Sequence, residues 1–119
     1  MTEPSKPWNG EQVRKWLERR LEVSRLDQAA ADRRGYEARD DYDKAAAEEW
    51  ACRALKGAEC TDDQAAFAGR LKELIAQDTY PATSIHDDER FDRHVRTYLR
   101  KLVKMAKANE GFEKMLRHQ

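Results

Sequence analysis

The sequence predicts an all-α fold, namely an antiparallel bundle of four long helices followed by a short C-terminal helix. Apolar residues recur at helical spacing and never alternate as in a strand. Only five Gly and three Pro interrupt the 119 residues, and charged residues make up 39% of the chain, well above the roughly 25% of an average globular protein. Long helices with short connections favour antiparallel neighbours. We expect residues 1–8 to form a flexible arm and residues 9–119 to form a single domain.

The first helix is predicted from about residue 10 to about residue 32. In the stretch WNGEQV, Asn9 is the expected N-cap and Gln12 completes a capping box. Arg20 falls in the middle of the apolar face of this helix. It either forms a salt bridge with an acidic neighbouring helix or is a cation held for a partner. The apolar face comprises Val13, Trp16, Leu17, Leu21, Val23 and Ala30.

Two further helices are predicted after a turn at Gly35. The second helix covers residues 36–57, and its buried face comprises Ala47, Trp50, Ala51, Ala54 and Leu55. The third helix starts in the stretch TDDQ, where Thr61 is the expected cap and Gln64 its capping-box partner, and it ends near residue 77. Its apolar stripe comprises Phe67, Ala68, Leu71, Leu74 and Ile75.

The fourth long helix follows the loop DTYPATS, and Ser84 is its expected cap. Asn109 is the expected cap of the short final helix, which carries Phe112, Met115 and Leu116. The fourth helix is predicted to bury Phe91, Val95, Tyr98, Leu99, Leu102, Val103 and Ala106.

The charges are sorted along the chain although the net charge is zero. Residues 27–64 hold 11 acids and 6 bases, a net charge of −5, whereas residues 90–119 hold 9 bases and 3 acids, a net charge of +6. Such asymmetry indicates a charged partner. In the stretch RFDRHVRTYLRKLVKMAK, a row of cations lies on the side of the helix opposite its apolar face. The candidate nucleic-acid-binding residues are Arg93, Arg96, Arg100, Lys101, Lys104 and Lys107.

Three interpretations of this row are open. It is a solvated helix face paired with the acids of the second helix, or it follows the phosphate backbone of a nucleic acid, or, least favoured, it binds a membrane surface. The row contains no acid, whereas solvated faces usually alternate in sign. It spans on the order of 20 Å of helix, the length of several phosphates. It also lacks Asn and Gln, which read adenine edges, so contact without sequence specificity is expected.

The acids of the second helix form a candidate protein interface. Asp40, Asp41 and Asp43 lie in the stretch EARDDYDK and share no single helix face. This distribution is typical of a solvated surface or of a docking site for a basic neighbour. Arg20 completes the candidate interface, as the cation held for a partner.

No motif in the sequence predicts catalysis. No Ser or Cys nucleophile has a nearby His, and no Gly-rich phosphate loop occurs. His86 and Glu89 lie one turn apart but have no second such pair with which to hold a metal. Cys52 and Cys60 are expected to be reduced packing residues in a cytoplasmic protein. Since no stretch approaches the roughly 20 apolar residues of a membrane span and no secretory signal is found, we expect a non-enzymatic protein without cofactor, metal or membrane contact.

The stretches RFDRHVRTYLRKLVKMAK and YEARDDYDKAAAEEW form opposite charge poles. This design resembles the small all-helical subunits of class 1 CRISPR effector complexes, and the resemblance covers residues 9–117. It implies a non-catalytic subunit that packs against neighbouring protein subunits, copies of itself among them, and presents a basic helix face to RNA or single-stranded nucleic acid. The alternative is a helical protein-interaction module without nucleic-acid contact, such as a phage-encoded inhibitor of the anti-CRISPR type or an assembly adaptor.

Overall fold

The computed structural model describes residues 8–80 and 87–108. Over these residues the all-α prediction is confirmed, because every regular element is a helix. The predicted cap Ser84, the predicted final helix from Asn109 and residues 1–7 of the predicted arm lie outside the described ranges. The elements are α1 (Gly10–Arg34), the 3-10 turn η1 (Tyr36–Ala38), α2 (Arg39–Leu55), α3 (Ala58–Thr61), α4 (Gln64–Ile75) and α5 (Asp88–Ala108).

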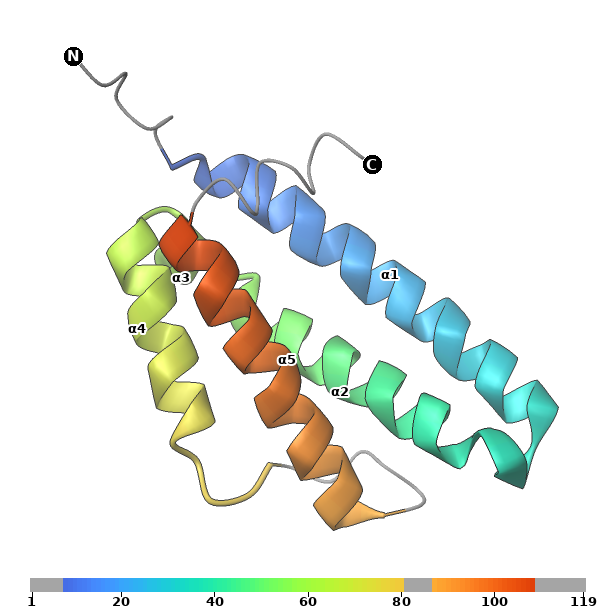
Figure 1. Ribbon diagram of the computed structural model, residues 1–119. Coiled ribbons are helices and arrows are strands. Elements are labelled where there is room, and N and C mark those ends of the chain that lie inside the picture. Colours follow the sequence, from blue (N-terminus) through green and yellow to red (C-terminus); the bar gives the residue numbers. More distant parts are fainter. Residues whose placement is uncertain (1–7, 81–86, 109–119) are drawn as a thin grey trace.

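The four longer helices form two hairpins (Figure 1). In the first, α1 and α2 run side by side in opposite directions and are joined at Gly35, whose φ of 84° suits a residue without a side chain. In the second, α4 and α5 pack together. The hairpins meet where α2 packs against α5, whereas α1 touches α4 and α5 only weakly among the described residues. The regular antiparallel bundle of four helices therefore stays a prediction.

Two of the predicted caps have different outcomes. Asn9 caps α1 as predicted, because its side-chain oxygen accepts a hydrogen bond from the backbone N–H of Gln12 at 3.1 Å. The predicted capping box at Thr61 is wrong, since Thr61 is the buried last residue of α3 and its hydroxyl donates to the Gly57 carbonyl at 3.1 Å. Asp63 caps α4 instead, accepting from the N–H three residues later at 3.1 Å. A short helix thus occupies the place where the sequence predicted a simple connection.

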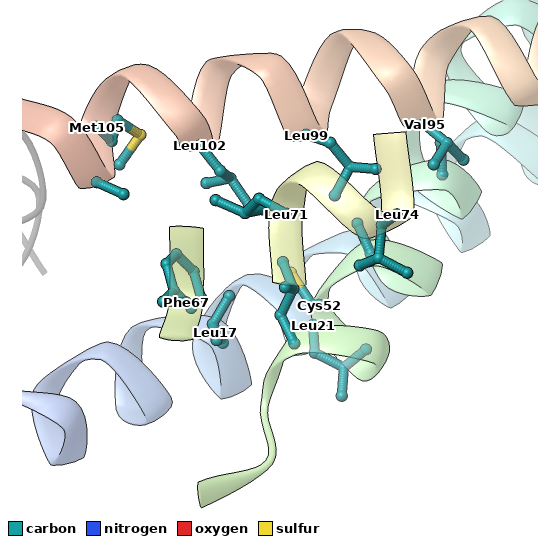
Figure 2. Close-up of a cluster of buried hydrophobic side chains, with 14 of the residues drawn as sticks. Leu17, Leu21, Cys52, Phe67, Leu71, Leu74, Val95, Leu99, Leu102 and Met105 are labelled. Carbon is teal, nitrogen blue, oxygen red and sulfur yellow. The ribbon is translucent and has the colours of Figure 1, made fainter. Parts of the chain in front are cut away.

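The core lies where both hairpins meet, and most of its residues follow the predicted helix faces (Figure 2). Eight predicted core residues lie nearer the surface, since Ala30 is exposed and seven others are half-buried. The half-buried ones are Val23, Trp50, Ala54, Ala68, Ile75, Tyr98 and Val103. The Trp50 ring still packs edge-on against the ring of Tyr80, with centroids 5.0 Å apart. The residues labelled in Figure 2 are Leu17, Leu21, Cys52, Phe67, Leu71, Leu74, Val95, Leu99, Leu102 and Met105, each at most 9% exposed.

Gly10 allows the start of α1 to pass close to the end of α3. A Cβ atom at this position would lie 2.6 Å from the Thr61 carbonyl oxygen and 2.7 Å from the Asp62 Cα, both backbone atoms. The neighbouring Trp8 indole also donates to that carbonyl, at 2.6 Å. Close backbone approach therefore excludes a side chain here.

We expect Gly10→Ala to lower the free energy of unfolding by about 2 kcal/mol, as forced overpacking does. Urea denaturation followed by circular dichroism measures the change. Gly69→Ala is the matched control, because a Cβ at Gly69, inside α4, meets nothing within 4 Å. There we expect a gain of up to about 1 kcal/mol from helix propensity. Equal effects at both glycines would contradict the close approach.

Candidate nucleic-acid interface

α5 has one apolar side and, from Arg93 to Lys107, one cationic side, whereas its first turn carries the exposed acids Asp88 and Glu89. Its buried residues are Phe91, Val95, Leu99, Leu102, Met105 and Ala106. Away from this side, Arg93, Arg100, Lys104 and Lys107 are exposed and Arg96 is half-buried, and Lys101 is exposed on the flank of α5 that faces α1 and α2. We call these six residues the cationic face. All six were predicted from the sequence, and the structure places them on one helix as expected.

The members of the cationic face share one feature, the absence of an ion pair with a described carboxylate, which sets them apart from six arginines of α1, α2 and α4. Among residues 8–80 and 87–108, no carboxylate lies within ion-pair distance of any of its six members. A side-chain cation that forms no ion pair within the fold is available to pair with an external anion. Arginines outside α5 that do pair with an acid are Arg14, Arg20, Arg25, Arg34, Arg53 and Arg70.

Arg96 has a second role, within the fold. Its guanidinium donates to the backbone carbonyls of Gln77 and Asp78 at 3.0 and 2.6 Å, just beyond the end of α4. It also lies over the Tyr80 ring, 5.3 Å from the centroid. Arg96 therefore ties the segment after α4 to α5 and is the member of the cationic face least free to move towards a ligand.

The start of α5 is bound to the acidic helix α2. Arg90 forms an ion pair with Asp43 at 2.7 Å, and His94 forms a hydrogen bond with Asp40 at 2.9 Å. That bond, together with the positive charges of Arg90 and Arg93, holds the pKa of Asp40 below its usual value. At the first turn, the Asp87 carboxylate accepts from the Arg90 N–H at 3.0 Å. Pairing with the acidic helix is thus confirmed for Arg90 and His94, but it does not extend to the cationic face.

The candidate protein interface is divided between surface and interior. The side chains of Asp40 and Asp41 are 63% and 58% exposed, and Asp41 pairs with Arg34 at 3.0 Å. Asp43 requires a correction, because it is fully buried against Arg90 and cannot reach a partner while the fold is intact. The place of Asp40 and Asp41 in a protein interface stays a prediction.

Arg20 forms the salt bridge that was one of its two predicted roles. Its Nη2 atom lies 2.9 and 3.1 Å from the two carboxylate oxygens of Glu48 on α2. Burial lowers the pKa of Arg20, but the hydrogen bond and charge of Glu48 outweigh this effect, so the pKa ends above its usual value. The Arg20 side chain is still 32% exposed, and its contact with a partner stays a prediction.

A groove of about 630 Å³ lies between α1, α2 and α5, and its lining includes Arg20, Glu48 and Tyr98. The Tyr98 hydroxyl lies 3.7 Å from the Cys52 sulfur. Burial raises the pKa of Cys52 to about 12 and also raises the pKa of Tyr98. Both groups are therefore protonated near neutral pH and neither is an activated nucleophile.

The residues that the structure describes contain no group of three His, Cys, Asp or Glu side chains able to hold a metal ion. His86, which the sequence paired with Glu89, lies outside them. Cys52 and Cys60 are both free thiols, and Cys52 belongs to the core as predicted. The exposed cations of α5, in contrast, are suited to binding anions.

A groove of about 430 Å³ lies between α4 and α5 and was not predicted from the sequence. Val103, predicted to be buried, is half-exposed and lines this groove together with Ile75. Lys72 of α4 lies on the same groove as three members of the cationic face. Lys72 and Ile75 are one turn apart in the sequence, but only the packing of α4 on α5 brings them beside Val103.

Comparisons with known proteins give no relative: the chain matches no family model, no curated protein and no solved structure. Within the described ranges, every helix is too short or too polar to cross a membrane. The function must therefore be inferred from the geometry and charge of the chain itself.

Proposed function

We propose that this protein is a non-enzymatic small subunit of a cytoplasmic nucleoprotein complex similar to class 1 CRISPR effectors. Its helices form a bundle that packs against neighbouring subunits, and its cationic face contacts the backbone of RNA or single-stranded DNA without sequence specificity. The observation that carries the proposal is the row of exposed cations on α5 without a carboxylate partner in the described part of the chain.

The dimensions of the cationic face support contact with several phosphates. From Arg93 to Lys107 the helix rises by roughly 20 Å, whereas successive phosphates along one strand are about 3.4 Å apart in axial rise. Arg93 and Arg100 can each bind a phosphate with two parallel hydrogen bonds, and Lys104 contributes a point charge. No Asn or Gln belongs to the face, so base edges would not be read through adenine-type contacts.

The salt dependence of oligonucleotide binding tests this proposal. A fluorescein-labelled 20-nucleotide oligouridine is titrated with the full-length protein between 50 and 200 mM salt, with fluorescence anisotropy as the readout. Because each contacted phosphate contributes a slope of about −0.7 in log affinity against log salt, four or five contacts predict a slope near −3. A slope shallower than about −1, or no binding at 50 mM salt, would contradict the proposal.

A protein-interaction module without nucleic-acid contact, such as a helical inhibitor or an assembly adaptor, is the second candidate. The groove between α4 and α5 favours this second candidate. The floor of the groove is apolar, and a phosphate backbone makes polar and ionic contacts instead. The salt titration separates the two candidates, since a protein interface with an apolar centre responds far less to salt.

A further inference from the structure

The groove between α4 and α5 has an apolar floor. Ile75 and Ala76 contribute to it from the end of α4, and Val103 contributes from α5. Ile75 and Val103 are half-buried and Ala76 is exposed, so the floor is open to solvent. Apolar surface left open in a concave site is favourable to cover, since each Å² removed from water contributes about 25 cal/mol.

The rim of this groove is entirely basic among the described residues that line it. Lys72 lies on the α4 side, and Arg100, Lys104 and Lys107 lie on the α5 side. All four side chains are exposed, and none is within ion-pair distance of a described carboxylate. A ligand that fits this groove must combine apolar groups at its centre with negative charges on both flanks.

We propose that the groove is a docking site for an acidic amphipathic helix of a partner protein. Such a helix places apolar side chains, spaced three and four residues apart, onto Ile75 and Val103. Carboxylates on its two flanks then meet Lys72 on one side and Arg100 and Lys104 on the other. This inference does not rest on nucleic-acid binding, because its decisive residues are the apolar ones.

A nucleic acid fits the same groove less well. Phosphates would use the basic rim but leave Ile75, Ala76 and Val103 uncovered. Proteins that hold single strands usually stack the bases on exposed aromatic rings, and no aromatic residue lines this groove. An acidic amphipathic helix, in contrast, uses both floor and rim.

The test uses a fluorescein-labelled model peptide of Leu, Glu and Ala with its Leu residues on one helical face. A scrambled peptide of the same composition has equal charge but no apolar face. Fluorescence anisotropy measures the affinity of the full-length protein for each. We expect the amphipathic peptide to bind at least about 10-fold more tightly than the scrambled one, a difference that moderate apolar burial produces.

Two pairs of substitutions locate the binding. The floor pair, Ile75→Ser with Val103→Ser, should weaken binding of the amphipathic peptide at least about 10-fold. The same pair should change the affinity for oligouridine by no more than about 2-fold. The rim pair, Lys72→Gln with Lys104→Gln, should weaken binding of the peptide several-fold. This pair keeps the proposal testable if the floor-pair variant does not fold. Lys44→Gln removes an exposed cation of α2 away from this groove and should change nothing.

Four outcomes would overturn the proposal. Equal binding of the scrambled peptide means that only charge is recognised. An equal loss of oligouridine binding in the floor pair assigns the groove to nucleic acid. Sedimentation velocity tests for self-association of the protein. If the protein self-associates and the floor pair abolishes this, the occupant of the groove is a second copy. If replacing Phe112 and Leu116 by Ser in the full chain raises the affinity for the peptide, the occupant of the groove is the protein's own C-terminal segment. Failure of oligouridine binding with intact peptide binding refutes only the proposed function.

Discussion

Simultaneous replacement of Arg93, Arg100 and Lys104 by Glu is expected to weaken oligouridine binding by about 100-fold or more at 50 mM salt. Each substitution removes a phosphate contact and adds a repelling charge to the same helix face. The three side chains are exposed and form no ion pair with a described carboxylate, so the fold should not depend on them. Far-ultraviolet circular dichroism and the thermal midpoint should therefore stay close to those of the unmodified protein.

The matched control is the triple replacement of Arg19, Arg33 and Lys44 by Glu. These residues of α1 and α2 are also exposed and also lack an ion pair with a described acid. The control changes the net charge by the same amount but leaves the cationic face intact, so most of the affinity should remain. An equal loss in both triple variants would mean that only the net charge matters. Unfolding of the α5 variant would mean that the face serves the fold, and the proposed function would fail.

The helical faces could be predicted from the sequence because burial follows a period of 3.6 residues. For this reason five of the seven predicted core positions of α5 are buried, with Tyr98 and Val103 half-buried, and all of its predicted cations except the half-buried Arg96 are exposed. The N-cap Asn9 was predictable for a similar reason, since a cap and its N–H partner are close in sequence. Local rules therefore gave the composition of the candidate site.

The contacts between helices could not be predicted in the same way. Whether Asp43 is buried depends on which helix covers that side of α2. The helix that does so is α5, whose Arg90 pairs with Asp43 although the two residues are 47 positions apart in the sequence. The same limit applies to the groove between α4 and α5, because Ile75 and Val103 become neighbours only through packing. At Thr61, a capping box was locally plausible, but the turn of α3 uses the Thr61 hydroxyl differently, binding it to Gly57 and to Arg14.

Loss of the Asp43 carboxylate is expected to have the largest effect on stability among the substitutions considered. Asp43 is fully buried and lies 2.7 Å from the Arg90 Nε atom. Removing one partner of a buried ion pair costs about 3 to 5 kcal/mol. Because Arg90 also lies 3.8 Å from Asp40, which remains after the substitution, the lower end of this range applies. We therefore expect Asp43→Ala to lower the free energy of unfolding by about 3 kcal/mol, measured by urea denaturation.

Asp41→Ala is the control, since Asp41 is 58% exposed and its pair with Arg34 lies on the surface. Exposed pairs usually contribute less than about 1 kcal/mol.

The ion pair of Asp43 also joins α2 to the first turns of α5, so its loss should speed hydrogen exchange in α5 more than in α1. The double variant Asp43→Leu with Arg90→Met should regain much of the stability, because a well-packed apolar pair can replace a buried ion pair. If Asp43→Ala costs no more than Asp41→Ala, then the Asp43–Arg90 ion pair adds little to the packing of α5 on α2, and the position of the cationic face does not depend on this ion pair.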